Sequence, residues 1–575
     1  MTLTRNDVAK LIEELRDTGS ECSEVEAKAA GSDLPKRLDQ TLSALSNRSG
    51  GGVILLGVDE AQGFSATGVR DSKKLQDDLA GLAADSMSPP VRPEFTVARI
   101  EGRTVLAAEI PECPAAQKPC HCKKDGLAGG SYIRVGASNR RMSDYEIHSY
   151  VSSRGQPRDD AEPVLSASLG DLDESALEKF ISALATSRPK LDLPEDRPRQ
   201  LLALNIAAEV DGVPRPTLAG LLVFGKYPQQ FFPQLVVTFL RYAGTDETTP
   251  GPMGERFLDN RGFEGSIPEI LRDAEVRILT SMQMRALITG LIREDIPEYP
   301  LVAVREALVN AVAHRDYSGY VKGAYIQVRM FSDRIEVHSP GGLFGAVTED
   351  NIDTEHSTRN QVLMRLLEDL HLVENRGTGI QAMIRAMRGA NLEPPVFQDR
   401  RSSFWVIFKN HTMMDAEAVR WLGRFSGVDI NDHERTALVY LRTHHRMANR
   451  DYQRLNSVDG PTATRDLRVL VSERLIEQHG TRGGAYYELA SALREALMSA
   501  AELPENQRRI LSYVEEHGSV ANADVRRLLG INADQAKYTL GCMVKSGLLR
   551  LEGHSKAAKY SAAAPADTGQ ATHLG

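Results

Sequence analysis

Three short blocks in the second half of the chain limit its fold more than any other feature. The block REALVNAVAHRDYS begins at Arg305, RIEVHSPGGL begins at Arg334 and ENRGTGI begins at Glu374. Helical spacing puts Glu306 and Asn310 on one face of a predicted helix. A carboxylate and an amide placed in this way can position a water and complete the shell of a hard cation such as Mg²⁺. Glycines in the other two blocks let backbone amides approach phosphates closely. These are Gly341, Gly342, Gly377 and Gly379.

In this order and spacing the three blocks resemble the GHKL ATPase family, in its branch with a RecG-like C-terminal or HATPase_c_4 domain. The resemblance covers roughly residues 295–410 and implies an α/β sandwich that binds ATP. It implies Asn310 as a ligand of Mg²⁺ and Glu306 as the general base of a slow ATPase. The implied nucleotide contacts also include Ser339, which stands near the family's usual adenine-reading Asp, and Arg376. For any block alone, the alternative is a solvated helix face or an ordinary turn.

The 575 residues are too many for one hydrophobic core, and 41% hydrophobic with 26% charged residues is typical of folded soluble proteins. The predicted fold class is therefore multidomain, with α/β and α+β parts. The predicted parts are an N-terminal domain at 1–155, a mixed connecting region at 164–290, the ATP-binding domain at 291–412, two helical modules at 430–490 and 504–562, and a disordered tail at 563–575.

The sequence also predicts a cytoplasmic protein without a membrane span. Its first residues, MTLTRNDVAKLIEELRDTG, lack the apolar stretch of a signal peptide, and no run of about eighteen apolar residues follows. Five cysteines in so long a chain fit a reducing compartment better than a disulfide framework. The net charge of −9 confines any nucleic-acid contact to local basic patches.

Carboxylates cluster in the N-terminal segment SECSEVEAKAAG, and another ends the strand-like run VILLGVD. Such groups can bind a hard divalent metal, which activates water for phosphodiester cleavage. Together with YIRVGASNRRMS at 132–143, these segments resemble the Schlafen or AlbA_2 core over about residues 10–150. Nuclease members of that family bind Mg²⁺ or Mn²⁺ and cut structured RNA. By position, the implied residues are Glu21, Glu26 and Asp59, with Lys28 as the accompanying cation. A solvated charged edge, or nucleic-acid binding without catalysis, remains the alternative.

Three arginines close to a glycine turn form a basic cluster that can contact phosphates without reading base sequence. They are Arg134, Arg140 and Arg141. Exposed arginines are common on protein surfaces, so an ordinary surface role is the alternative.

Three cysteines of the same domain are candidate zinc ligands. Cys120 and Cys122 would share one face of a strand, and Cys113 lies a few residues before them. Their spacing lacks the C-x-x-C pair that is typical of structural zinc sites.

The segment 449–489 has the order of a winged helix, with GTRGGAYYEL as its wing. The helix from about Thr462 to Ser472 would bury its leucines and present a polar face. That face carries Thr464, Arg465 and Arg468. Such a helix can donate to base edges and phosphates in the major groove. The second module at 504–562 has the same order with fewer arginines, so either module could instead serve dimerisation.

The domain order resembles bacterial RecG-related or Schlafen AlbA_2 transcriptional regulators. This resemblance implies an ATP-binding, DNA-binding regulator whose nucleotide state controls nucleic-acid binding, with a homo-oligomer as the default for winged helices. The alternative is a metal-dependent Schlafen-type endoribonuclease that cuts tRNA-like RNA in phage defence under ATP control. The sequence contains no G-x-x-x-x-G-K-[ST] loop to drive translocation.

Overall fold

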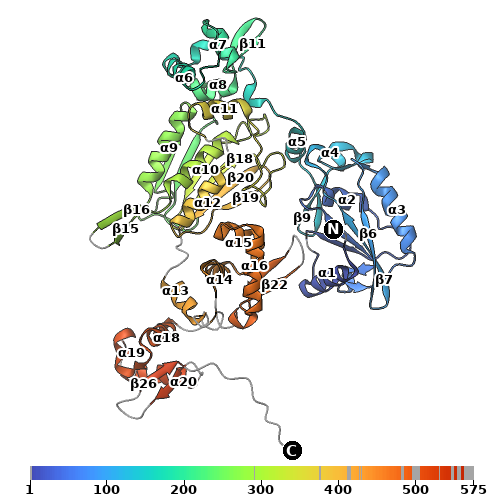
Figure 1. Ribbon diagram of the computed structural model, residues 1–575, viewed down its shortest axis with the longest axis vertical. Coiled ribbons are helices and arrows are strands. Elements are labelled where there is room, and N and C mark those ends of the chain that lie inside the picture. The colour runs from blue at the N-terminus through green and yellow to red at the C-terminus, as the bar shows by residue number, and fades with distance from the viewer. Residues whose placement is uncertain are drawn as a thin grey trace, which may run out of the picture. The chain divides into compact units, whose positions relative to one another are not determined.

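The chain forms two compact units in the computed structural model (Figure 1). The first comprises Met1–Leu467 with His479–Tyr486, and the second Arg468–Gln478 with Tyr487–Gly575. The structure describes residues 3–21, 23–289, 292–373, 377–410, 416–425, 428, 430–480, 485–494, 505–529, 531, 533–545, 549–552 and 559–562. Among these residues no helix combines the length and apolar character needed to cross a bilayer.

The N-terminal domain is a four-stranded sheet with helices on both faces. Its strand order is β1-β2-β7-β6, in which β1 and β2 run parallel and the other pairs antiparallel. One apolar cluster lies under α2 and α3 and another under α1, so the central strand β7 is buried on both sides. The elements are α1 (Arg5–Thr18), β1 (Val25–Lys28), α2 (Leu38–Asn47), β2 (Gly52–Leu56), α3 (Ser72–Asp85), β6 (Glu94–Ile100), β7 (Arg103–Ile110), and the hairpin β9 (Tyr132–Val135) and β10 (Ser138–Arg141), followed by α5 (Asp144–Ser152).

A small helical module follows this domain. Every residue of its helix α8 is buried, because α8 packs against α11 (Gln361–Asp369) of the next domain. Residues of the module and of that domain form one continuous apolar cluster. The module contains α6 (Glu174–Ser187), α7 (Arg197–Ala203), β11 (Ala207–Val210), β12 (Val213–Pro216) and α8 (Leu218–Phe224).

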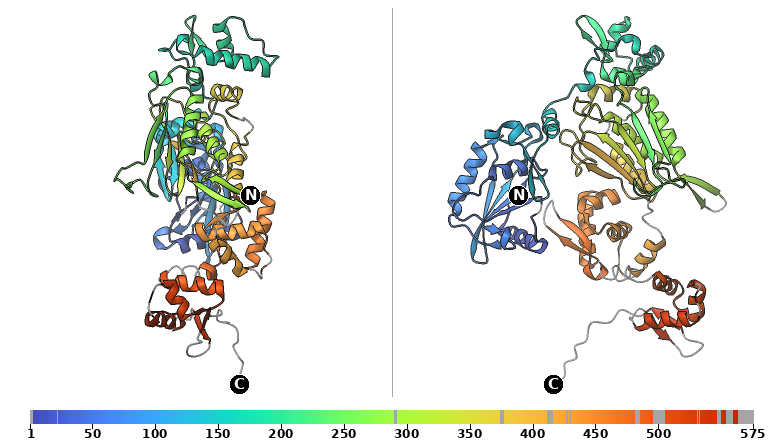
Figure 2. Two further views of the ribbon diagram at one scale, coloured as in Figure 1. Left: turned by 90° about the vertical axis from the view of Figure 1, so that its left-hand side faces the viewer. Right: turned by 180° about the vertical axis from the view of Figure 1, so that it is seen from behind.

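The third part is a six-stranded sheet in the order β14-β13-β17-β18-β20-β19. Helices α9, α10 and α12 cover one face of it, as the front and rear views show (Figures 1 and 2). Only β13 and β17 pair in parallel. The elements are β13 (Val237–Arg241), β14 (Asp259–Phe263), α9 (Ile267–Ser281), the hairpin β15 (Met284–Thr289) and β16 (Ile292–Pro297), α10 (Leu301–Ala313), β17 (Ile326–Met330), β18 (Arg334–Pro340), α11 (Gln361–Asp369), α12 (Gly379–Gly389), β19 (Val396–Asp399) and β20 (Ser403–Lys409).

The structure moves the predicted boundary at residue 291. Strands β13 and β14 and helix α9 come from the region predicted as a connecting segment, yet they complete this sheet. The reason is a pairing between distant segments, in which Val237 lies opposite Ile326. The run LVVTFLRY was recognisable as a strand, but its partner was not.

The two C-terminal modules share one order of elements: a helix, a short strand, two helices and two strands. In the second module the three strands form a sheet in the order β24-β26-β25 around a small apolar cluster. The first contains α14 (Asp432–His444), β21 (Met447–Ala448), α15 (Asn449–Asn456), α16 (Gly460–Ser472), β22 (Ile476–His479) and β23 (Tyr486–Leu489). The second contains α18 (Glu505–His517), β24 (Val520–Ala521), α19 (Asn522–Leu529), α20 (Ala533–Lys545), β25 (Leu549–Glu552) and β26 (Lys559–Ala562). The predicted tail at 563–575 lies outside the described residues.

Candidate functional site

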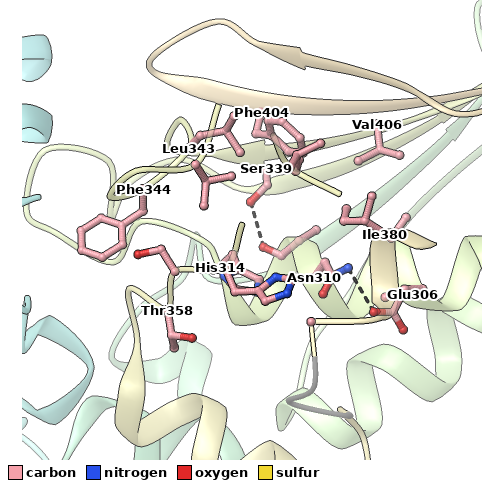
Figure 3. A pocket seen from close by; sticks show the side chains of 18 of the residues that line it. Glu306, Asn310, His314, Ser339, Leu343, Phe344, Thr358, Ile380, Phe404 and Val406 are labelled. Carbon is pink, nitrogen blue, oxygen red and sulfur yellow. Dashed lines mark hydrogen bonds between the residues drawn. The ribbon is translucent and has the colours of Figure 1, made fainter. Parts of the chain in front are cut away.

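Helix α10, the end of β18 and the loop that follows it enclose a hollow of about 1140 Å³, which includes its open mouth (Figure 3). Seven residues predicted from the three sequence blocks line this cavity. They are Glu306, Asn310, Ser339, Gly341, Gly342, Gly377 and Gly379. The eighth predicted contact, Arg376, lies outside the described residues. The fold therefore brings together groups that lie as far apart in the sequence as Glu306 and Gly379.

The polar end of the cavity lies on α10. The side-chain amide of Asn310 donates from Nδ2 to Oε1 of Glu306 at 3.2 Å, which turns its oxygen away from the carboxylate (Figure 3). Gly379 lies directly against Glu306, since a Cβ at that position would be 1.8 Å from Oε1. Amide and carboxylate oxygens are ligands that Mg²⁺ prefers. These two side chains therefore fit a magnesium ion that accompanies a nucleotide.

The other end of the cavity is largely apolar. Val337, Phe404 and Val406 line it together with the buried Ser339. The Ser339 hydroxyl donates to the carbonyl of Ala311 at 2.8 Å, so its oxygen presents only lone pairs to a ligand. Such a surface suits a flat ring that carries a hydrogen-bond donor.

Gly341 closes the turn between β18 and the loop. Its φ is +96°, a conformation that L side chains rarely adopt. A Cβ there would lie 2.5 Å from Cβ of Asp316 and 2.6 Å from Nη1 of Arg359. Only glycine fits this position, so the backbone approaches the cavity closely.

His314 was not among the predicted site residues, yet its ring lies in the cavity beside Asn310 (Figure 3). The side chain of His314 is exposed to solvent within the cavity. Protein atoms nevertheless surround the ring closely enough to desolvate it. Burial, together with the charge of Arg359, lowers the pKa of His314 to about 4 from its ordinary value of 6.5. The imidazole is therefore neutral at physiological pH. Its position directly after the buried helix, at the start of HRD, was the available signal.

Replacing His314 with glutamine should change how stability depends on pH. Between pH 6.5 and about 4, unfolded wild-type protein takes up a proton at this residue that the folded protein does not. The difference in Tm between wild type and His314→Gln should stay constant above neutral pH and move in favour of the variant as the pH falls. Calorimetric scans across this range measure it, with exposed His371→Gln as the control. A difference that stays constant through acid pH would contradict the assignment.

The predicted acidic site of the N-terminal domain is a buried ion cluster. Glu21 and Glu26 are 8% and 5% exposed. The guanidinium of Arg134 on β9 contacts Oε2 of Glu26 and lies 3.1 Å from Oε2 of Glu21. Lys28 lies 2.9 Å from Oε1 of Glu26 and 3.6 Å from Oε1 of Glu21, which also accepts from the amide of Ala27 at 2.8 Å. Two positive groups thus balance two negative groups.

The electrostatics of the cluster agree with this pairing. Burial raises the pKa of Glu21, and the negative charge of Glu26 adds to that rise. Burial also works against the charged form of Lys28, but the two glutamates outweigh it and raise the pKa of that amine. Lys28 lowers the pKa of Glu21, so this cation partly offsets the effect of burial in a site with little water.

This arrangement does not fit a divalent metal. All four oxygens of Glu21 and Glu26 already have a cationic or amide partner. Asp59 instead caps a short helical turn, where it accepts from the amide of Ala61 at 3.0 Å and from Nε2 of Gln62 at 2.8 Å. Among the described residues these three carboxylates are not close enough to one another to share an ion. The predicted Mg²⁺ or Mn²⁺ site is therefore at odds with the geometry.

The three arginines predicted to contact phosphates differ in exposure. Arg140 and Arg141 are exposed on β10, where they can reach a phosphate backbone. The side chain of Arg134 is only 1% exposed, because it forms ion pairs with the buried glutamates. Its predicted role as a phosphate contact does not match its position.

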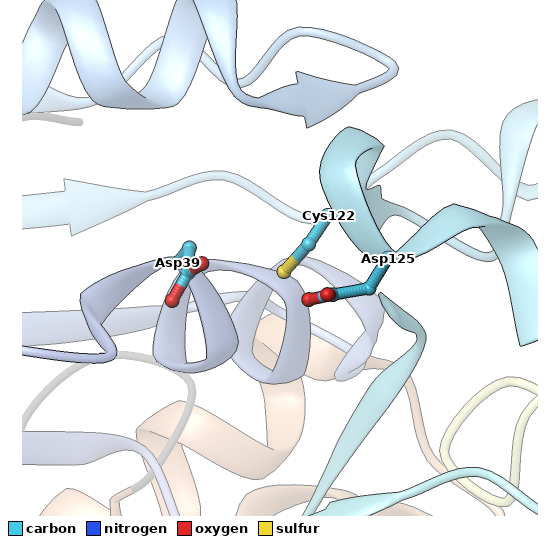
Figure 4. A group of neighbouring side chains, drawn as sticks. All are labelled: Asp39, Cys122 and Asp125. Atoms are coloured by element: carbon cyan, nitrogen blue, oxygen red, sulfur yellow. The ribbon is translucent and has the colours of Figure 1, made fainter. Parts of the chain in front are cut away.

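The three predicted zinc ligands lie in one apolar cluster, but among the described residues their sulfur atoms do not form a group that could share an ion. Cys122 lies instead beside Asp39 and Asp125 (Figure 4), and within the described part of the chain neither Cys113 nor Cys120 belongs to a group with metal-ligand spacing. Lys124 already pairs with Asp39 at 2.5 Å. Burial, with the charge of Asp39, raises the pKa of the Cys122 thiol to about 11. A neutral thiol beside an occupied carboxylate gives no support to zinc.

Helix α16 carries the predicted reading face. Arg465 has a side chain that is 71% exposed, and Arg468 is exposed one turn further on. Thr464 is half-buried and its hydroxyl accepts from Nδ2 of Asn449 at 3.1 Å. The two arginines therefore lie on the solvent side of the helix. Thr464 instead links α16 to α15 through its hydrogen bond with Asn449.

Family models match three segments of the chain. The model described as "Putative ATP-dependent DNA helicase recG C-terminal" (HATPase_c_4) matches residues 323–408, and the model "Schlafen, AlbA_2" matches residues 21–143. A domain of unknown function, DUF8451, matches residues 148–238. The first match begins after α10 and therefore does not include Glu306 and Asn310. No curated protein matches the chain.

Two solved structures are similar to the chain. The DIP2311 protein from Corynebacterium diphtheriae is 19% identical over 97% of this chain and 99% of its own, with a TM-score of 0.35. The N-terminal domain of a "Putative ATP-dependent DNA Helicase RecG-related Protein" from Nitrosomonas europaea is 31% identical over 25% of this chain and 95% of its own, with a TM-score of 0.20. The chain therefore combines one segment that matches the Schlafen, AlbA_2 model with another that matches the RecG-related HATPase_c_4 model.

Proposed function

We propose that the chain is an ATP-responsive, DNA-binding regulator in which the nucleotide held by the α10 cavity controls how tightly the protein binds DNA. The observation that carries the proposal is the meeting of seven predicted residues from separate sequence blocks in one cavity. Asn310 would hold Mg²⁺, Glu306 would act as the general base, glycine backbone would approach the phosphates, and the apolar end would take adenine. The bound nucleotide brings its charge and shape to the occupied state alone. It can therefore favour one conformation of the protein over the other.

The DNA-binding part of the proposal rests on the C-terminal modules. Their order of helices and strands is that of winged helix-turn-helix domains, and α16 presents Arg465 and Arg468 to solvent. A helix of this kind enters the major groove and donates to bases and phosphates. We propose that Arg140 and Arg141 add sequence-independent phosphate contacts, and that a homodimer presents two such surfaces to two half-sites.

Fluorescence anisotropy of a labelled mixed-sequence DNA duplex tests the function. Affinity would be measured with Mg²⁺ and ATP, with a non-hydrolysable ATP analogue, with ADP and without nucleotide. We expect at least about a fivefold difference in Kd between the ATP and nucleotide-free states, which is the low end of allosteric coupling. The same affinity in all four conditions would sink the proposal.

A second candidate is a Schlafen-type endoribonuclease with a role in phage defence, which the AlbA_2 match supports. The ion pairs of Glu21 and Glu26 speak against it, because both carboxylates are already neutralised. We therefore expect labelled total tRNA to stay intact with Mg²⁺ or Mn²⁺, with and without ATP. Cleavage by wild-type protein that Glu26→Gln abolishes would establish the nuclease instead.

A further inference from the structure

The loop between β18 and α11 touches the cavity on one side and a C-terminal helix on the other. Ten of its residues line the cavity. The later ones include Val347, Ile352, Glu355, His356 and Ser357. Asp353 lies between two of these lining positions, and its side chain is 11% exposed. The loop is tied together locally, since Asn351 accepts from the amides of Thr348 at 2.6 Å and Thr354 at 2.9 Å. A ligand that displaces Ile352 or Glu355 must therefore move Asp353.

Asp353 is held by two arginines of α15. Arg450 lies 2.5 Å from its carboxylate and Arg454 lies 3.7 Å away. Arg450 also donates to the hydroxyl of Thr354 at 3.4 Å, and Arg454 donates to the carbonyl of Glu349. The loop that lines the nucleotide cavity is thus also the acidic partner of α15.

These arginines are incompletely satisfied where they lie. Their side chains are 32% and 16% exposed, so most of each is covered. Within the described residues, the Nε group of each is buried and makes no hydrogen bond. A buried N–H without an acceptor is destabilising, so the contact with the loop is not an optimal one. A partner with more acceptor oxygens could satisfy both groups better.

Helix α15 is the first helix of the helix-turn-helix, the one that crosses the phosphate backbone in this motif. It moves with α16, because Asn449 bonds to Thr464 and the buried hydroxyl of Tyr452 donates to Asp466 at 3.0 Å. Any change that frees α15 therefore frees the reading helix as well.

We propose that Arg450 and Arg454 have two mutually exclusive partners: the carboxylate of Asp353 in the nucleotide-free protein, and backbone phosphates of duplex DNA once the loop has moved. Asp353 imitates a phosphate and blocks α15. The inference rests on the proposed function and names how the cavity controls DNA binding. Competition follows from burial, since a guanidinium covered by the loop cannot also contact a phosphate.

The test compares Asp353→Asn with wild type in DNA binding without nucleotide, over a series of salt concentrations. We expect Asp353→Asn to bind the labelled duplex about tenfold more tightly, with little further gain from ATP. The slope of log affinity against log salt should steepen by about 1.8, because two additional phosphate contacts release about 0.9 counterion each. Adding Arg450→Gln and Arg454→Gln should return both values to those of wild type.

The control is Asp350→Asn, an exposed acid in the same loop that removes the same charge. It should behave as wild type, and calorimetric ATP binding should verify that both variants keep the cavity. If nucleotide controls DNA affinity in wild type but Asp353→Asn has wild-type affinity and slope, the competition is wrong and the proposed function stands. If no variant binds DNA, both fail. If Asp353→Asn gained affinity for duplex RNA but not for duplex DNA, DNA would not be the partner of these arginines.

Discussion

Replacing Arg134 with alanine should lower the free energy of unfolding of the N-terminal domain by roughly 3–5 kcal/mol, because removing one partner of a buried pair leaves uncompensated charge. Glu21 and Glu26 would then share Lys28 alone, in a site where each is less than a tenth exposed. Hydrogen exchange measured by mass spectrometry on the full chain follows this domain separately from the others. Peptides that cover β1 and β9 should lose protection in the variant.

The loss should also shrink at low pH. Burial and the charge of Glu26 raise the pKa of Glu21 already in wild type, so a carboxyl deprived of Arg134 protonates more readily in the folded state than when unfolded. A folded pKa above the unfolded value destabilises at neutral pH, and this deficit disappears as the pH falls through the raised value. Arg140→Ala, on the exposed part of the same hairpin, should change stability by less than about 0.5 kcal/mol. Unchanged protection in Arg134→Ala would mean that the carboxylates are solvated, and a metal site would again be tenable.

The α10 cavity was the part of the molecule most open to prediction from sequence. Helical spacing is local, so Glu306 and Asn310 could be placed on one face before any partner was known. Glycine turns are also local, and Gly341 does adopt a positive φ in a position that excludes any side chain. The tertiary fold was needed only to show that these local features meet in one cavity.

Contacts between distant segments could not be predicted in this way. Arg134 was assigned to the surface because nothing near it in the sequence shows that it reaches Glu21 and Glu26. The pairing of Arg450 with Asp353 joins residues almost a hundred positions apart, and a single sequence carries no signal for it. In each case an arginine forms an ion pair with a buried or half-buried carboxylate. Composition and spacing do not reveal such a pair.

Replacing Asn310 with alanine should weaken Mg²⁺-dependent ATP binding by about 100-fold, the order of magnitude for losing a ligand group at a metal–phosphate centre. Asn310 offers its side-chain oxygen to the cavity because its Nδ2 group already donates a hydrogen bond to Glu306. Titration calorimetry with Mg²⁺ and with EDTA separates the metal-dependent part of the affinity, and that part should disappear in the variant. Arg305→Ala is the matched control, since this side chain is exposed on the same helix.

Glu306→Gln should give a different result from Asn310→Ala at the same site. Glutamine keeps the size of Glu306 and can still accept from Asn310, so ATP binding should survive within a few-fold. Its neutral amide cannot take a proton from water, so any hydrolysis should fall by at least about 100-fold, as expected for the loss of a general base. DNA binding would then remain responsive to ATP in Glu306→Gln and become unresponsive in Asn310→Ala, since control by occupancy needs binding and not turnover. If Asn310→Ala binds ATP with the metal dependence of wild type, the assignment of a magnesium site to Asn310 is wrong. If Glu306→Gln hydrolyses ATP at the rate of wild type, the assignment of Glu306 as the general base is wrong.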